Sequence, residues 1–139
     1  MFNGIFKKKI KKISFEDMQY IIQNGNNQYI IINTLPITEQ QCLIKNTISY
    51  QKEESYINTL IESYNFDNNK IIIYGKNNND ADVEDKCNKL CGLGFTEVYM
   101  YTGGLFEWLL LQDIYGQTEF PTTTNIIDLL KYKPMRELC

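Results

Sequence analysis

Three features are missing from this 139-residue sequence, and each absence excludes a class of protein. No apolar run is long enough to span a bilayer, and no h-region with a cleavage site is evident, so we expect neither a transmembrane helix nor a secretory signal. Basic residues are not in excess, because the net charge is −3 and the isoelectric point is near 5.0. General nucleic-acid binding depends on a basic face and is therefore not expected. The expected location is the cytoplasm, with the nucleus as an alternative.

The third missing feature is a CxxC pair. Without it, a zinc site built from the four cysteines (Cys42, Cys87, Cys91 and Cys139) is not expected. Cys87 and Cys91 are four residues apart on the apolar face of an expected helix, which is typical of small buried hydrophobic residues. We expect no metal and no cofactor.

Apolar runs and helical stripes predict one α/β domain. A chain of this length, 43% hydrophobic, can bury about two-thirds of its unfolded surface. The continuous runs 29–32 and 71–74 are typical of strands buried on both faces of a parallel sheet, and 10–13 and 98–101 predict further strands. Between them, apolar residues recur at helical spacing. We expect a central, mostly parallel sheet of about five strands with helices on both faces.

Helix boundaries are also predicted. Ser14 followed by Asp17 approximates a capping box for a first helix that ends near 24–25. Gly92 or Gly94 can end the helix that carries Val83, Cys87, Leu90 and Cys91. Thr124 can cap a final helix over 125–132, before Pro134.

The stretch 71–104, IIIYGKNNNDADVEDKCNKLCGLGFTEVYMYTGG, is the centre of this organisation. Its order YGK…D, helix, LGF-x-x-VYMYTGG-x-x-x-W resembles the second half of a rhodanese-like domain. The resemblance spans 13–116. It implies the rhodanese-like fold, which related phosphatases share, and an active-site loop directly after the strand at 71–74.

Three positions depart from the family pattern. Gly75 stands where the resemblance implies the catalytic cysteine, and Cys42 stands where a histidine is usual, in a chain that has no histidine. The segment 33–35, Asn-Thr-Leu, replaces an Asp-x-Arg turn. Sulfur transfer needs a thiolate nucleophile cradled by backbone N–H groups. We therefore expect no catalytic residue at this place.

The loop after the strand at 71–74 is the predicted binding site, in a degenerate form. Its residues are Gly75, Lys76, Asn77, Asn78, Asn79, Asp80, Ala81 and Asp82. A calcium loop is disfavoured, because the mid-loop glycine and the distal bidentate glutamate are missing. Asp80 or Asp82 is expected to cap the following helix, and Glu84 and Asp85 suit its positive end. These carboxylates would compete with an anionic substrate.

The resemblance extends to cysteine-less family members that act in regulatory, ciliary and centrosomal proteins, and it implies recognition of another protein. The expected function is therefore an inactive rhodanese-like domain that serves as a protein-binding, scaffolding or regulatory module. The alternative is a sulfurtransferase or related phosphatase with a relocated nucleophile, Cys42 or Cys87, whose pKa would have to be lowered. A third hypothesis is a small-molecule sensor that uses the loop pocket.

Three regions are expected along the chain. Residues 1–12 form a basic N-terminal arm, for which weak membrane-surface contact through 7–12 is an alternative to a solvated arm, without stable insertion. Residues 13–116 form the rhodanese-like domain, and 117–139 form an extension with one helix packed on it. The helix around Trp108 is apolar nearly all round, so either the tail or a partner is expected to cover its outer face.

Overall fold

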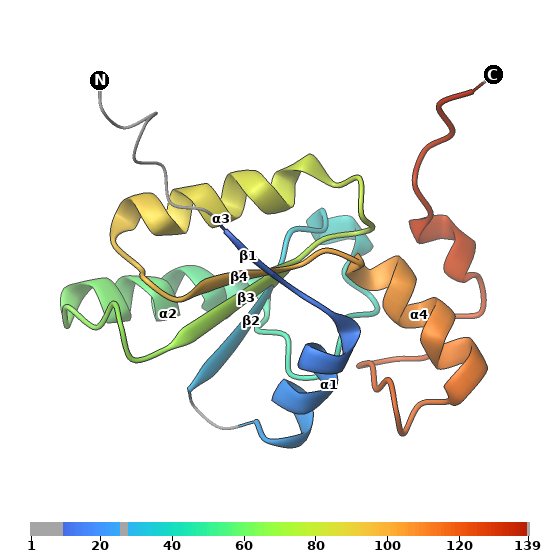
Figure 1. Ribbon diagram of the computed structural model, residues 1–139, viewed down its shortest axis with the longest axis horizontal. Helices are drawn as coiled ribbons and strands as arrows, with labels where there is room; N and C mark the ends of the chain where they lie inside the picture. The colour runs from blue at the N-terminus through green and yellow to red at the C-terminus, as the bar shows by residue number, and fades with distance from the viewer. Residues whose placement is uncertain (1–9, 26–27, 139) are drawn as a thin grey trace.

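The structure is a computed structural model that describes residues 10–25 and 28–138. The elements follow in the order β1 (Lys11–Ile13), α1 (Phe15–Gln23), β2 (Tyr29–Asn33), η2 (Ile37–Glu39), α2 (Tyr50–Glu62), β3 (Lys70–Tyr74), α3 (Ala81–Leu93), β4 (Val98–Tyr101), α4 (Gly104–Tyr115) and η3 (Leu129–Tyr132). The strands pair in parallel in the order β1-β4-β3-β2. Helices α2 and α3 cover one face of this sheet, and α1 and α4 cover the other (Figure 1). The predicted α/β class is confirmed.

The two central strands divide their side chains between the faces by strict alternation. Ile71 and Ile73 of β3 pack with α2 and α3, whereas Ile72 and Tyr74 pack with α1 and α4. β2 is in register, with Ile31 opposite Ile72, and its side chains divide in the same way. Both strands are buried on two sides, which explains why their sequences are continuous apolar runs.

The predicted helix ends are found at α1 and α3. At α1, the Ser14 N–H donates to Asp17 Oδ2 at 3.0 Å and the Asp17 N–H donates to Ser14 Oγ at 3.4 Å, which completes the capping box. At α3, Asp80 is the N-cap and Gly94 ends the helix with φ at +118°, a left-handed conformation that favours glycine.

The expected fifth strand is not found. Among the described residues the sheet has four strands, and the apolar segment around Ile44 contributes only isolated bridges, Ile44 to Thr122 and Thr47 to Ile31. Asn46 has φ at +72°, and Thr47 Oγ1 donates to the Ile44 carbonyl at 2.6 Å. This tight turn interrupts the extended path, so the apolar residues fill the core without forming a ladder.

The helix expected over 125–132 is also not found at that length. Only η3 is helical, and its N-cap is Asp128, whose Oδ1 accepts from the Leu130 N–H at 3.2 Å. Thr124 Oγ1 donates instead to the Gln41 carbonyl at 2.9 Å, because the chain here runs alongside residues 41–43. The tail nevertheless packs on the domain, since Tyr132 is fully buried. Tertiary pairing has overridden the helical pattern.

Part of the chain lies outside the described residues. The expected basic arm falls mostly on residues 1–9, and Cys139 also lies outside the described part. Within 10–25 and 28–138, no helix combines the length and the apolar character that crossing a membrane requires.

Candidate functional site

The loop between β3 and α3 lies at the carboxyl ends of the parallel strands, where ligand sites of open α/β sheets are found. Helix α4 holds its backbone: the Leu105 N–H donates to the Gly75 carbonyl and the Phe106 N–H to the Lys76 carbonyl, both at 2.9 Å. A glycine at position 104 permits this close contact, because a Cβ there would lie only 2.8 Å from Asn77 Cα. The φ of Gly104 is +71°, which also favours glycine. The first turn of α4 therefore fixes the shape of the loop.

The carboxylate of Asp80 occupies the inside of the loop. Its Oδ2 accepts hydrogen bonds from the Lys76 N–H and from Thr34 Oγ1, both at 3.0 Å, and its Oδ1 accepts from the Asp82 N–H at 3.0 Å. A Cβ added to the buried Gly75 would lie 2.3 Å from Asp80 Oδ2 and 2.5 Å from Val83 Cγ2. The protein's own carboxylate thus takes both a loop N–H group and the space that a side chain at position 75 would need.

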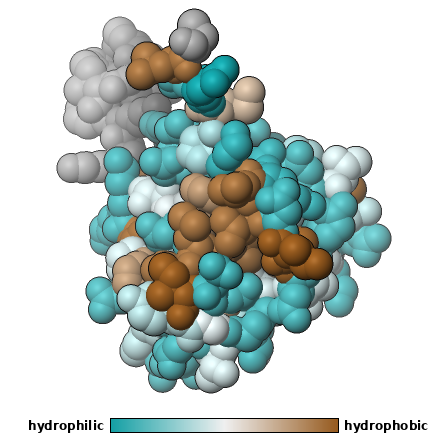
Figure 2. Space-filling view, turned by 90° about the vertical axis from the view of Figure 1, so that its right-hand side faces the viewer, coloured by the Kyte–Doolittle hydropathy of each residue, from teal (hydrophilic) through white to brown (hydrophobic). Residues whose placement is uncertain are grey.

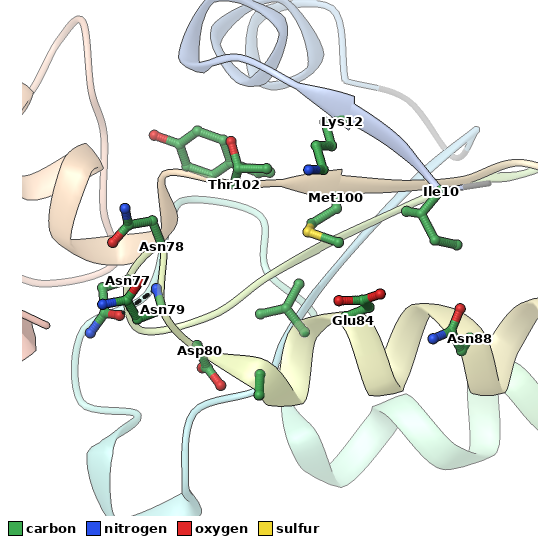
Figure 3. A pocket seen from close by; sticks show the side chains of 13 residues that line it. Ile10, Lys12, Asn77, Asn78, Asn79, Asp80, Glu84, Asn88, Met100 and Thr102 are labelled. Atoms are coloured by element: carbon green, nitrogen blue, oxygen red, sulfur yellow. Dashed lines mark hydrogen bonds between the residues drawn. The ribbon is translucent and has the colours of Figure 1, made fainter. Parts of the chain in front are cut away.

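A pocket of about 640 Å³ opens beside this loop, between α3, β4 and β1 (Figure 3). Lys12 approaches it from β1, and Glu84 from α3 on the opposite side. The lining residues are Ile10, Lys12, Asn77, Asn78, Asn79, Asp80, Ala81, Val83, Glu84, Asn88, Met100, Tyr101 and Thr102. Side-chain carboxamides and aliphatic groups predominate, so the pocket offers neutral hydrogen-bonding groups beside an apolar wall.

The structure divides the predicted site residues among four places. Asn77 to Ala81 line the large pocket, whereas Gly75 is buried beneath the loop. Lys76 points elsewhere, with its Nζ 3.3 Å from Glu39 Oε2. Asp82 lines a second pocket of about 410 Å³, together with Glu53 and other residues of α2, α3 and the loop after β2.

Sequence reasoning missed the part of the pocket that comes from β1 and β4. Lys12 lies opposite Met100 in the parallel register, so these residues meet only because the first strand pairs with the last. Tyr101 adds a buried phenol whose hydroxyl donates to Glu107 at 2.6 Å. Burial, and then that hydrogen bond to the carboxylate, raise the pKa of Tyr101. No local signal in the sequence places the first strand beside the last.

The tail holds the loop from the other side. Asn77 Nδ2 donates to the Tyr132 carbonyl at 3.0 Å, and Asn77 Oδ1 accepts from the Asn79 N–H at 2.9 Å. One side chain therefore joins η3 to the middle of the loop. With α4 on one flank and η3 on the other, the loop is anchored at several backbone positions.

The two cysteines considered as relocated nucleophiles are buried away from the pocket. Cys87 is fully buried, and burial, followed by the nearby Cys91 and Glu84, raises its pKa to about 12. A nucleophilic thiol needs the opposite shift. Cys42 is also fully buried, and its thiol donates to the Thr124 carbonyl at 3.4 Å. Neither residue lines the large pocket.

Comparisons with known proteins agree with this geometry. A family profile described as the rhodanese-like domain matches residues 14–111. The BH2092 protein of Bacillus halodurans superposes with a TM-score of 0.60 at 20% identity, over 83% of this chain and 80% of that one. The Alr3790 protein of Anabaena sp. gives 0.58 at 21% identity, over 86% and 96% of the two chains.

A third solved structure carries a functional description. The single-domain sulfurtransferase RDL2 of Saccharomyces cerevisiae superposes with a TM-score of 0.54 at 13% identity, over 78% of this chain and 95% of that one. Identities this low show a shared fold. Among curated protein sequences, none matches this chain.

Proposed function

Because the chain belongs to the rhodanese-like domain family, whose profile matches residues 14–111, we propose that it is a member without sulfur-transfer activity that works as a protein-binding or regulatory module. The observation that carries this proposal is the Asp80 carboxylate inside the loop. Sulfur or phosphoryl transfer on this fold needs a nucleophile at the loop opening and free N–H groups for an anion. Gly75 has no nucleophile, and the Lys76 N–H is bound to Asp80.

Two independent defects support the loss of chemistry. Restoring the thiol alone would place Cβ 2.3 Å from Asp80 Oδ2, so the loop or the carboxylate would have to move. The negative charge of Asp80 would also disfavour a thiolate and an anionic substrate beside it. Restoring activity therefore requires at least two changes.

The loop residues 75–82 are proposed as the recognition surface, with a segment of another protein as its ligand. Asn78 and Asn88 present carboxamides to the pocket, and Ile10 and Met100 present apolar groups. Carboxamides pair with peptide N–H and C=O groups equally well, because each has both donors and an acceptor. The anchored loop supplies the rigid framework that lowers the entropic cost of binding.

The absence of catalysis is tested by two assays: sulfur transfer from thiosulfate to cyanide, and hydrolysis of an aryl phosphate. We expect no turnover above background from the native chain or from Gly75→Cys. A Gly75→Cys/Asp80→Ser double variant tests whether the carboxylate is the second obstacle. Native turnover that disappears in Cys42→Ser or Cys87→Ser would show that the active site has been relocated rather than lost.

Binding is tested by affinity capture from cells followed by calorimetry with the purified partner. Asn78→Arg/Asn88→Arg fills the pocket, whereas Asn58→Arg changes an exposed amide on α2 and serves as the matched control. We expect the pocket variant to lose a partner that the native chain and the control both retain. Equal affinity of all three proteins for every captured partner would contradict the assignment of the loop as the recognition surface.

A further inference from the structure

Helix α4 has an apolar face on the outside of the molecule as well as on the inside. Its inner residues Leu105, Trp108 and Leu109 are buried in the core. Phe106, Leu110 and Ile114 follow one another at intervals of four residues and form an outer stripe. Phe106 is half-buried against the core, whereas Leu110 is 39% exposed and Ile114 is 71% exposed. Figure 2 looks onto this side of the molecule and shows apolar side chains gathered near its centre.

The tail covers only part of this face. Leu129 packs against the core beneath, and Tyr132 is fully buried, but Leu130 on the outward side of η3 remains 55% exposed. Clusters of exposed apolar side chains mark interaction sites on protein surfaces. Of the two covers expected from the sequence, the tail supplies one flank and leaves the outer stripe open.

Near the ends of the stripe lie two residues of opposite charge, Lys131 and Asp113. η3 lies beside the first turn of α4, because Asn77 binds the Tyr132 carbonyl while Leu105 binds the Gly75 carbonyl of the same loop. Lys131 of η3 therefore lies near the N-terminal end of α4. Asp113 lies seven residues beyond Phe106, about 10 Å further along the helix axis. Neither Lys131 nor Asp113 forms an ion pair within 10–25 and 28–138.

We propose that this face binds a second copy of the chain, with the two α4 helices antiparallel across a twofold axis. In that arrangement each apolar stripe covers the other, and Asp113 of each copy faces Lys131 of the other copy. In a twofold-symmetric interface every contact occurs twice. A surface with opposite charges at its two ends is therefore complementary to itself. The two helix dipoles are also antiparallel, which brings the positive end of each helix near the negative end of the other. The interface does not use loop 75–82 and is independent of the proposed recognition function.

Sedimentation velocity over a concentration series tests the apolar contact. We expect the native chain to reach twice its 16.3 kDa mass at the upper concentrations. Ile114→Glu should remain monomeric throughout, because in each copy it buries a carboxylate against the apolar stripe of the other. Ile37→Glu is the matched control, since Ile37 is 61% exposed on η2, and it should dimerise like the native chain.

Charge reversal tests the orientation. Asp113→Lys and Lys131→Asp should each raise the dimer dissociation constant by about five-fold, because each reversal creates two like-charge contacts per dimer. The double reversal should return the constant to near the native value. A native chain that stays monomeric, a dimer that survives Ile114→Glu, or a double reversal no tighter than either single one would each overturn the proposal. Unchanged circular dichroism and melting temperature would show that the variants are folded.

Discussion

The two faces of the sheet are built from different kinds of core. On the α2 and α3 face the strands contribute aliphatic residues such as Ile71 and Ile73, and the helices that cover them adjoin these strands in the chain. On the α1 and α4 face the core contains Tyr74, Trp108 and Tyr132, which arrive from three distant parts of the sequence. The first face is closed by neighbouring elements, whereas the second depends on the tail.

Polar atoms explain part of this difference. The Tyr74 hydroxyl accepts from the Ile44 N–H at 3.1 Å, and Trp108 Nε1 donates to the Pro121 carbonyl at 3.1 Å. Buried hydroxyl and indole groups cost free energy unless they are paired. An aromatic core therefore needs specific partners at specific places. The segments around 44 and 121 provide them for Tyr74 and Trp108, whereas the buried hydroxyl of Tyr132 has no hydrogen-bond partner among the described residues. The core on the α2 and α3 face is mainly aliphatic, and its aromatic residues Phe66 and Phe95 carry no polar side-chain atom, so it needs only volume and alternation.

The largest effect is expected from deleting the tail after Phe120. The deletion removes the buried Tyr132 and the acceptor of Trp108, and it uncovers the aromatic face. Loss of one large buried aromatic residue already costs about 3–5 kcal/mol, which is comparable to the whole stability of many domains. We expect loss of the cooperative unfolding transition, or a much lower melting temperature, in calorimetry.

A shorter deletion serves as the control. Removing 135–139 takes away the exposed Met135 and Leu138 but leaves η3 in place. Its melting temperature should equal that of the native chain. If both deletions melt alike, the aromatic face does not depend on the tail, and the contrast between the two faces fails.

Substitutions in β3 should separate the faces. Ile72→Ala and Ile73→Ala should each cost about 3 kcal/mol in chemical denaturation, because both side chains are fully buried. Combined with Leu105→Ala on the α1 and α4 face, Ile72→Ala should show a coupling of about 0.5 kcal/mol or more, since both residues belong to one cluster. Ile73→Ala should be additive with Leu105→Ala. Equal coupling of both pairs would mean that the sheet does not insulate one core from the other.

A smaller effect is expected at the junction between β3 and α3. Asp80→Ala removes the N-cap of α3 and the acceptor for the Lys76 N–H, which should cost about 1–2 kcal/mol. Asp82→Ala in the first turn of α3 is the control and should cost less than half of that. Amide hydrogen exchange should quicken at the start of α3 and leave α1 and α4 unchanged. Faster exchange throughout α4 would show that the loop transmits strain to the aromatic face.

The smallest expected effect is a decline in the free energy of unfolding as the solution becomes alkaline. Cys87 has a pKa raised from 9.0 to about 12 by burial, so the folded state holds its proton more tightly than the unfolded state does. The resulting stability is fully present below pH 9 and is lost as the pH rises from 9 towards 12. Tyr101 shifts in the same direction from 10.0, so the α2 and α3 face should weaken first.

This order is measured by denaturant unfolding at several alkaline pH values. Cys87→Ala should make the decline between pH 9 and pH 10 shallower, because in the unfolded chain the pKa of the thiol is 9.0 and that of a tyrosine is 10.0. Tyr101→Phe should have a smaller effect in this range. If Cys87→Ala leaves the slope unchanged, the thiol is not the group responsible.

The sequence predicted the local structure of both faces well and the contacts that close the aromatic face poorly, for a physical reason. Runs such as 71–74, the capping box at Ser14 and the left-handed Gly94 are set by interactions within a few residues. These local preferences and the tertiary structure agree there, so the β-α units were predicted with their approximate bounds. The α4 helix and its all-round apolar character were predicted on the same basis.

The failures involve contacts between residues far apart in the chain. Thr124 has the chemistry of a helix cap, but it pairs with Gln41, more than eighty residues away. The apolar pattern around Ile44 suits a strand, but the Tyr74 hydroxyl and the tail position this segment without a ladder. Lys12 lines the candidate pocket only through the pairing of β1 with β4. Such pairings have no signature in a single sequence.

At the candidate site the sequence predicted the residues of the loop and the competition by its carboxylates. It did not predict which carboxylate turns inward, because Asp80 and Asp82 are equivalent as helix caps in sequence. The space left by Gly75 and the hydroxyl of Thr34 select Asp80. That choice is made by close packing rather than by propensity.

The inward Asp80 behaves as a tethered competitor for its own loop. An anion dissolved in the cell must displace a group that can never diffuse away, and short tethers give effective concentrations in the millimolar range or above. Free sulfite, thiosulfate or phosphate would need to exceed that local concentration and also overcome the repulsion of a fixed negative charge. The loop is thus shielded from the abundant small anions of its surroundings without any lid, and a ligand must enter by contacts that do not depend on negative charge.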